Sequence, residues 1–253
     1  MNFIRERVLN GEFMAGAWCN LGSSITVEMA SMMGYDWVLV DQEHGPGDNM
    51  NLLGQVQAIS VGGAAPLVRI AWNEMPRFKR ALDIGAAGIM VPYVQSKAEA
   101  ELAAASMRYP PAGIRGVASS PRAAGYGGKF EKYHAKANDN LLTIVQVETF
   151  QTMKNLDEIA LVTGVDVLFV GPLDLSISLN MPGRFQDPQF IKVLKTVAQT
   201  AKKAGKAAGI LLPDPGLIDK VHGLGYTFVA AGADGGMVMA GLKQSLDELQ
   251  NYK

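Results

Sequence analysis

The chain contains one cysteine, three histidines and little net charge. Of its 253 residues, 19% are charged, and the formal net charge is −1. The single cysteine, Cys19, excludes an intramolecular disulfide and any cluster of several cysteines around a metal. The near balance of acids and bases excludes the broad positive field that nucleic-acid binding requires, so we expect no nucleic-acid partner.

Long apolar runs are absent as well. No stretch approaches the roughly 20 apolar residues that cross a bilayer, and the mixed charge of Met1–Arg7 does not match a secretory signal. We therefore expect a cytoplasmic protein that has no membrane partner. Hydrophobic residues nevertheless make up 48% of the chain. They can form a large core, and the length suits one α/β barrel or two small domains.

Short apolar runs alternate with segments of helical periodicity. The runs are Met14–Trp18, Trp37–Val40, Pro66–Ile70, Gly88–Val94, Thr143–Val147, Val165–Val170, Ala207–Leu212 and Phe228–Gly232. The helical segments are Val27–Met33, Met50–Ser60, Arg77–Ile84, Lys97–Arg108, Thr152–Leu161, Gln189–Lys203, Gly216–His222 and Gly236–Gln250. Eight such pairs predict a parallel sheet closed into a (β/α)8 TIM barrel. An open doubly wound sheet is the alternative, but no Gly-x-Gly-x-x-Gly turn follows the first run.

One segment interrupts this regular spacing. Tyr109–Asn140 is rich in Gly and Pro, and a structureless stretch of that length usually forms a functional loop or a lid. Its Gly-rich part, Ala124–Lys129, lacks the spacing of a P-loop. Arg115 and Arg122 could contact a distal carboxylate or hydroxyl groups of a substrate, also across a subunit boundary, or could anchor the loop itself. Because no linker divides the chain, we predict a single domain over residues 1–253.

Polar residues gather where the predicted strands end, which is where a β/α barrel carries its chemistry. They are Trp18, Asn20, Asp41, Glu43, His44, Arg69, Gln146, Glu148 and Asp174. The alternative for any one of them is that polar sequence simply resumes where a strand leaves the core. The gathering of the whole set favours an active site at this edge of the barrel.

Two carboxylates, Glu148 and Asp174, follow consecutive buried runs. A charged group at the edge of a core needs a partner, because an unpaired buried charge is costly. A hard divalent cation is one candidate partner, and a salt bridge to Arg69 is the other. His44 directly follows a strand end beside two acids. A neighbouring carboxylate orients an imidazole and raises its basicity, so His44 is a candidate general base.

Longer motifs resemble a known family, the HpcH/HpaI aldolases. The motifs are Asp36–Pro46, Pro66–Glu74, Lys79–Pro92, Arg108–Gly116, Gln146–Thr149 and Val170–Ser176. The HpcH/HpaI aldolases are class II, metal-dependent pyruvate aldolases, among them 4-hydroxy-2-oxoheptanedioate aldolase and 2-dehydro-3-deoxyglucarate aldolase. The resemblance extends from about Gly16 to the final helix. It implies a TIM barrel of the phosphoenolpyruvate/pyruvate-domain type.

The resemblance assigns a metal site and a base. It implies that Glu148 and Asp174 are the protein ligands of a divalent ion, Mg²⁺, Mn²⁺ or Co²⁺. It implies that His44 is the catalytic base and that Asp41 polarises it. It also implies that Asp83 raises the basicity of the histidine.

The resemblance also assigns the substrate contacts. Arg69 matches the arginine that contacts the keto oxygen of pyruvate. Gln146 and the backbone at Leu173 and Asp174 match pyruvate-binding positions. We add Trp18 as a substrate-binding candidate because it ends the first strand, although packing accounts for a tryptophan more often than ligand binding does.

The implied activity is the reversible cleavage of a 4-hydroxy-2-oxo acid to pyruvate and an aldehyde, through a metal-stabilised pyruvate enolate. One rival function is an acyl-CoA lyase of the citrate lyase β-subunit type, and another is a catalytically silent oligomeric barrel. The apolar final helix, Met237–Leu249, predicts burial against another subunit, and the resemblance implies a hexamer. The sequence leaves the aldehyde unidentified.

Overall fold

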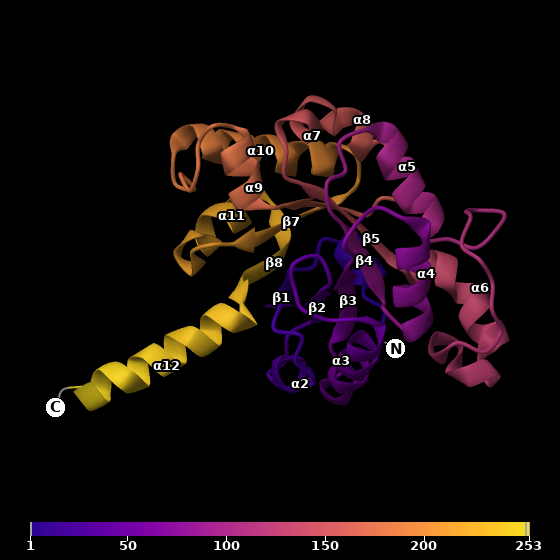
Figure 1. Ribbon diagram of the computed structural model, residues 1–253. Coiled ribbons are helices and arrows are strands. Elements are labelled where there is room, and N and C mark those ends of the chain that lie inside the picture. The colour runs from indigo at the N-terminus through magenta and orange to yellow at the C-terminus, as the bar shows by residue number, and fades with distance from the viewer. Residues whose placement is uncertain (1, 251, 253) are drawn as a thin grey trace.

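A computed structural model describes residues 2–250 and 252 and shows a closed barrel (Figure 1). Eight parallel strands pair in sequence order, and the last pairs with the first. They are β1 (Met14–Cys19), β2 (Trp37–Asp41), β3 (Ala65–Arg69), β4 (Gly88–Val91), β5 (Leu142–Val147), β6 (Val167–Val170), β7 (Ala207–Leu212) and β8 (Tyr226–Ala233). The predicted (β/α)8 barrel is therefore confirmed, and the open sheet is excluded.

Helices surround the barrel in Figure 1. They are α1 (Arg5–Leu9), α2 (Ser24–Met32), α3 (Asn49–Gly62), α4 (Met75–Ile84), α5 (Lys97–Ser106), η1 (Arg122–Gly127), α6 (Phe130–Asn140), α7 (Phe150–Lys154), α8 (Leu156–Ala160), α9 (Pro172–Ser178), α10 (Pro188–Lys203), η2 (Pro215–Leu217), α11 (Ile218–Leu224) and α12 (Asp234–Gln250). The single helix predicted over Thr152–Leu161 is two short ones, because Asn155 leaves the helical conformation. No helix in the described part of the chain is long and apolar enough to cross a membrane.

Side chains fill the lumen of the barrel. Trp37 stacks on Phe228 at a ring separation of 4.3 Å, and Phe169 packs edge-on against both. Gly16 makes room for this cluster, since a Cβ there would lie 2.0 Å from the Trp37 ring. Each such aromatic stabilises the fold by about 1.5–3 kcal/mol through burial. A solid lumen confines any substrate to the ends of the strands.

The segment Tyr109–Asn140 is not the structureless loop that we expected. It contains η1 and the three-turn helix α6, whose Tyr133 and Ala137 are buried. Because it runs from the end of α5 to the start of β5, it lies at the amino edge of the barrel, opposite the predicted site. A lid over the site of the same chain is therefore wrong. Gly and Pro, which are frequent in the first half of the segment, drew the prediction away from the helix that follows.

The last helix, α12, leaves the barrel as an extended arm (Figure 1). Only its first residue, Asp234, is buried, where its carboxylate accepts hydrogen bonds from the Asn20 N–H and the Thr26 hydroxyl. The helix exposes apolar side chains along its length: Met237, Val238, Met239, Leu242, Leu246 and Leu249. Within one chain, the arm has nothing to cover these side chains.

Candidate active site

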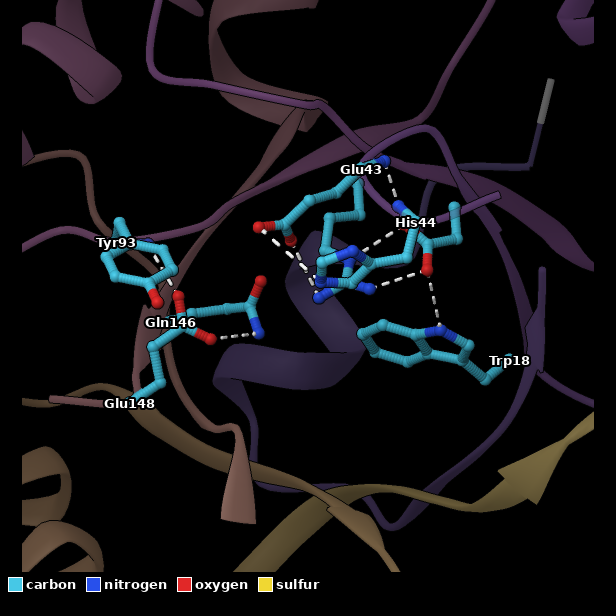
Figure 2. Close-up of polar contacts among 8 residues, drawn as sticks. Trp18, Glu43, His44, Tyr93, Gln146 and Glu148 are labelled. Atoms are coloured by element: carbon cyan, nitrogen blue, oxygen red, sulfur yellow. Dashed lines mark hydrogen bonds and ion pairs between the residues drawn. The ribbon is translucent and has the colours of Figure 1, made fainter. Parts of the chain in front are cut away.

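A cavity of about 450 Å³ opens at the carboxyl ends of the strands. Most of the polar residues predicted at the strand ends line it or lie beside it, and Figure 2 shows several of them around one space. The lining residues are Trp18, Asn20, Asp41, His44, Arg69, Gln146, Phe169, Gly171, Pro172, Leu173, Asp174, Leu211, Leu212, Pro213, Gly232 and Ala233. Among the described residues that line it, no lysine is present, so a lysine Schiff base is not supported.

Asp41 and Arg69 form the buried ion pair at the base of the site. They are register partners at the ends of β2 and β3, so both side chains enter the lumen at the same level. The Arg69 Nε and Nη2 groups donate to the two Asp41 carboxylate oxygens at 2.9 and 2.5 Å. Burial raises the pKa of Asp41, but the hydrogen bonds and charge of Arg69 outweigh it, and the pKa lies below its usual range. Asp41 therefore stays ionised and fixes the guanidinium.

Trp18 covers this ion pair from β1. Its indole Nε1 donates to Asp41 at 3.3 Å, and the Arg69 guanidinium carbon lies 4.7 Å from the centre of the indole ring. The side chain is buried yet lines the cavity. Trp18 thus packs against the ion pair, and its indole ring also lines the cavity that a substrate would enter.

Glu43 binds the other side of Arg69. Its Oε2 lies 2.8 Å from Arg69 Nη1, and its Oε1 lies 3.8 Å from His44 Nε2 (Figure 2). Burial raises the pKa of Glu43, and the positive charges of Arg69 and His44 oppose that rise. We noted this acid at a strand end but assigned it no role. The register of neighbouring strands brings it against Arg69, which spacing along one strand cannot reveal.

His44 lies at the exposed mouth of the cavity, with a side chain that is 67% exposed. The carboxylate nearest its imidazole is Glu43. The Asp41 carboxylate instead accepts a hydrogen bond from the backbone N–H of His44 at 3.3 Å, and it also accepts hydrogen bonds from Arg69 and Trp18. Among the described residues, Asp41 thus makes no hydrogen bond or ion pair with the imidazole, and its polarisation of His44 stays a prediction. Asp41 shapes the turn that carries His44.

Asp83 does not reach this site within one chain. It lies at the far end of α4, where its carboxylate accepts a hydrogen bond from Arg115 Nη2 at 2.8 Å. Arg115 is buried there between the Tyr109 and Tyr133 rings. Arg122 donates to the Ile84 carbonyl at 2.9 Å. Both arginines thus anchor their own segment, and the assignment of Asp83 to the basicity of His44 stays a prediction that one chain does not support.

Glu148 is a second buried carboxylate of the site, one residue beyond β5. Its Oε1 accepts the Tyr93 backbone N–H at 2.6 Å, and its Oε2 accepts Gln146 Nε2 at 3.0 Å. Burial, together with the charges of Glu43 and Asp174, raises the pKa of Glu148 to about 7, although the Tyr93 hydrogen bond lowers it. The carboxylate is therefore poised to lose a proton when a positive charge approaches.

Asp174 and Leu173 project from the first turn of α9, a helix that we did not predict. Both side chains are exposed and line the cavity. Asp174 is thus not a buried acid at a strand end, as its sequence context suggested. Gly171, just before this helix, is needed for space, since a Cβ there would lie 2.9 Å from Glu148 Oε2. The missing side chain lets α9 approach the carboxylate.

The donor set fits a hard divalent cation. In the described part of the chain neither Glu148 nor Asp174 forms an ion pair, because Asp41 and Glu43 bind Arg69. The alternative salt bridge to Arg69 is therefore wrong. Among the described residues, the buried Oε1 atom of Gln146 has no hydrogen-bond partner. Two unpaired carboxylates and a free amide oxygen are the ligand types that Mg²⁺ and Mn²⁺ accept.

Tyr93 is a further residue that we did not predict at the site. The apolar run Gly88–Val94 placed it inside a strand, but β4 ends at Val91 and Pro92 begins a loop. The backbone N–H of Tyr93 thereby reaches Glu148. Pro92 was the available signal, because proline rarely continues a central strand.

Comparison with known proteins agrees with this geometry. The model of the HpcH/HpaI aldolase/citrate lyase family matches residues 14–240. The chain belongs to this family. A 4-hydroxy-2-oxo-heptane-1,7-dioate aldolase of Klebsiella pneumoniae is 40% identical over 233 residues, which cover 92% of this chain and 88% of the relative. A 2-keto-3-deoxy-L-rhamnonate aldolase of Escherichia coli is 37% identical over 252 residues, with 100% and 94% covered.

A solved structure supports the same assignment. An HpcH/HpaI aldolase/citrate lyase family protein of Burkholderia cenocepacia superposes with a TM-score of 0.92 at 34% identity, and 98% of each chain is covered. The predicted family and the predicted aldolase class of enzyme are therefore confirmed. The relatives named above are both aldolases, so the acyl-CoA lyase is not the better supported function.

Proposed function

We propose that this protein is a metal-dependent aldolase that reversibly cleaves a 4-hydroxy-2-oxo acid to pyruvate and an aldehyde. One observation carries the proposal. Among the described residues, neither Asp174, which lines the cavity, nor Glu148, which is hydrogen-bonded to the lining residue Gln146, forms an ion pair, while Arg69 is held by two other acids. Acids without an ion pair can hold a divalent ion, and a substrate with two neighbouring oxygens can chelate that ion. The fixed guanidinium of Arg69 suits a substrate oxygen that becomes negative during the reaction.

Glu148 and Asp174 would hold the divalent ion, Mg²⁺, Mn²⁺ or Co²⁺. When bound, such an ion supplies Lewis-acid polarisation of the keto oxygen. Glu148 must be deprotonated to act as a ligand, and its pKa of about 7 sets the pH below which that form becomes scarce. The Tyr93 N–H and the Gln146 amide fix the orientation of the carboxylate.

His44 would accept the proton of the C4 hydroxyl. As that proton leaves, the bond between C3 and C4 breaks, and its electron pair moves toward the keto oxygen, which leaves the enolate of pyruvate and the free aldehyde. Protonation of the enolate at C3 completes pyruvate. Glu43, 3.8 Å from His44 Nε2, is placed to stabilise the imidazolium. A positioned base typically contributes about 10²–10⁴-fold.

Arg69 would stabilise the charge that develops on the keto oxygen. Its Nε, Nη1 and Nη2 atoms each contact Asp41 or Glu43, and the guanidinium has five N–H groups. The remaining N–H groups can therefore donate to a substrate oxygen. A fixed donor of this kind is typically worth about 3–4 kcal/mol of the barrier.

Gln146, Trp18 and the backbone at Leu173 and Asp174 would bind the pyruvate half. All four line the cavity, and the free Oε1 of Gln146 shows that its amide is not fully engaged by the protein.

We further propose that the protein assembles as a homo-oligomer, with a hexamer as the expected state. The apolar side chains of α12 are 44–66% exposed, and burial against a second chain would remove them from water. Leu242→Asp combined with Leu246→Asp should lower the mass measured by native mass spectrometry, and Gln244→Asp on the same helix should not. An unchanged mass in the double variant would contradict this role.

We also propose that residues 1–253 act as one domain in the cytoplasm. The strands of the barrel come from the whole span between Met14 and Ala233, so no part of that span can leave without opening the barrel. The single cysteine, Cys19, is free and buried, which suits a reducing compartment.

The deciding experiment follows pyruvate release from a 4-hydroxy-2-oxo acid or oxaloacetate with a coupled assay. Exhaustive chelation with EDTA should abolish release, and added Mg²⁺, Mn²⁺ or Co²⁺ should restore it. Full activity after chelation would refute metal dependence. No pyruvate with any of these substrates, combined with turnover of a CoA thioester, would favour the acyl-CoA lyase.

A further inference from the structure

Tyr93 and Trp72 form an exposed aromatic pair next to the site. They follow β4 and β3, on the same edge of the barrel as Glu148, and their ring centroids are 5.9 Å apart. Trp72 is 50% exposed and Tyr93 is 39% exposed. Large aromatic side chains left open beside a catalytic cavity are typical of ligand contacts.

The backbone of Tyr93 is held in an unfavourable conformation. Its φ angle is +53°, in the left-handed region, where a bulky side chain costs about 1–2 kcal/mol. Glycine would remove this strain and still offer the N–H group that binds Glu148. The backbone contact therefore does not explain why this position is a tyrosine. A function of the tyrosine side chain would explain it.

The phenol of Tyr93 is available for such a use. In the described residues its hydroxyl has no hydrogen-bond partner, and Figure 2 shows it turned toward the side of the site where Glu148 lies, with His44 and Trp18 across the intervening space. A phenol is neutral at pH 7, so the hydroxyl can donate a hydrogen bond to a substrate.

We propose that Tyr93 is a substrate-binding residue that selects the aldehyde half, donating a hydrogen bond to a hydroxyl group on the carbon next to the aldehyde. The inference rests on the proposed aldolase function. The rings of Tyr93 and Trp72 would contact the carbon chain. The preferred aldehydes are accordingly 2-hydroxyaldehydes.

The test compares aldehydes that differ in one group, in the condensation direction with pyruvate and Mg²⁺. Glycolaldehyde and acetaldehyde differ only in the hydroxyl. Tyr93→Phe should lower the ratio of their kcat/KM values about tenfold, the typical worth of one hydrogen bond. Tyr126→Phe is the matched control, because Tyr126 is also exposed with a positive φ but lies on η1.

Two outcomes would overturn the role of Tyr93. If Tyr93→Phe lowers kcat/KM equally for both aldehydes, the hydroxyl affects the fold or Glu148 and does not bind the substrate hydroxyl. If kcat/KM is unchanged for both aldehydes, the Tyr93 hydroxyl has no part in the reaction. Exchange of the pyruvate methyl hydrogens with D2O in the wild type tests the proposed function separately, since no aldehyde takes part.

Discussion

The buried carboxylate of Glu148 makes the stability of the metal-free protein depend on pH in an unusual direction. Its pKa rises from the ordinary 4.5 to about 7 in the fold, chiefly because burial disfavours the charged form. A folded-state pKa above the unfolded value means that the folded state binds a proton more tightly. The stabilising contribution is therefore complete below pH 4.5 and is lost as the pH rises through about 7.

The size of the effect follows from the same pKa change. One pKa unit corresponds to about 1.4 kcal/mol, so the rise corresponds to about 3 kcal/mol in the free energy of unfolding. Between pH 5 and pH 8, about 2–3 kcal/mol of this should disappear. Only 2% of Glu148 is exposed, so solvent screening does little to reduce the value.

Glu148→Gln isolates this contribution, because glutamine stays neutral at every pH. The Tyr93 N–H can still donate to the amide oxygen, and the Gln146 amide can turn so that its unpartnered Oε1 accepts the new NH2 group. Relative to the wild type, the variant should therefore gain about 2–3 kcal/mol between pH 5 and pH 8 when both are metal-free.

The assay is urea unfolding in excess EDTA at fixed protein concentration, since assembly would otherwise change the apparent stability. Glu131→Gln, at an exposed position on α6, controls for the loss of one glutamate. If the stability difference between Glu148→Gln and the wild type is the same at pH 5 and pH 8, the account of a proton held by burial is wrong. Saturating Mg²⁺ should stabilise the wild type at pH 8 and not the variant.

Three further substitutions test the positions around Glu148. Arg69→Ala should lower turnover about 10²–10³-fold and also cost about 3–5 kcal/mol in urea unfolding, because Asp41 stays buried without its partner; a variant as stable as the wild type would contradict that pairing. His44→Ala should lower turnover about 10²–10⁴-fold and leave the unfolding midpoint nearly unchanged, since the side chain is exposed, and wild-type rates would remove it from the mechanism. Asp83→Asn breaks the ion pair with buried Arg115 and should lower the thermal midpoint; a shifted pH profile of turnover at full stability would instead tie Asp83 to His44.

Local sequence patterns predicted the barrel and the edge of the barrel at which its polar site residues lie. Apolar runs such as Trp37–Val40 and Thr143–Val147 could be recognised because strands buried on both faces need continuous apolar residues, and that requirement acts within a few neighbours. The acids and bases that follow these runs stand out for the same local reason. Arg69 and Glu148 were therefore predictable as candidate residues from the sequence alone.

Tertiary structure alone decided how those residues pair. Asp41 binds Arg69 because β2 and β3 are in register at that level, and Glu43 reaches the same guanidinium from the loop beyond. Pairing of this kind depends on distances between strands, which no spacing along one strand encodes. Because Arg69 pairs with Asp41 and Glu43, Glu148 and Asp174 have no cationic side chain as a partner in the described part of the chain. Asp83 lies at the end of α4 and pairs with Arg115 instead. The chemistry was thus visible in residue types, but acids without an ion pair, which support the proposed metal site, exist only in the closed barrel.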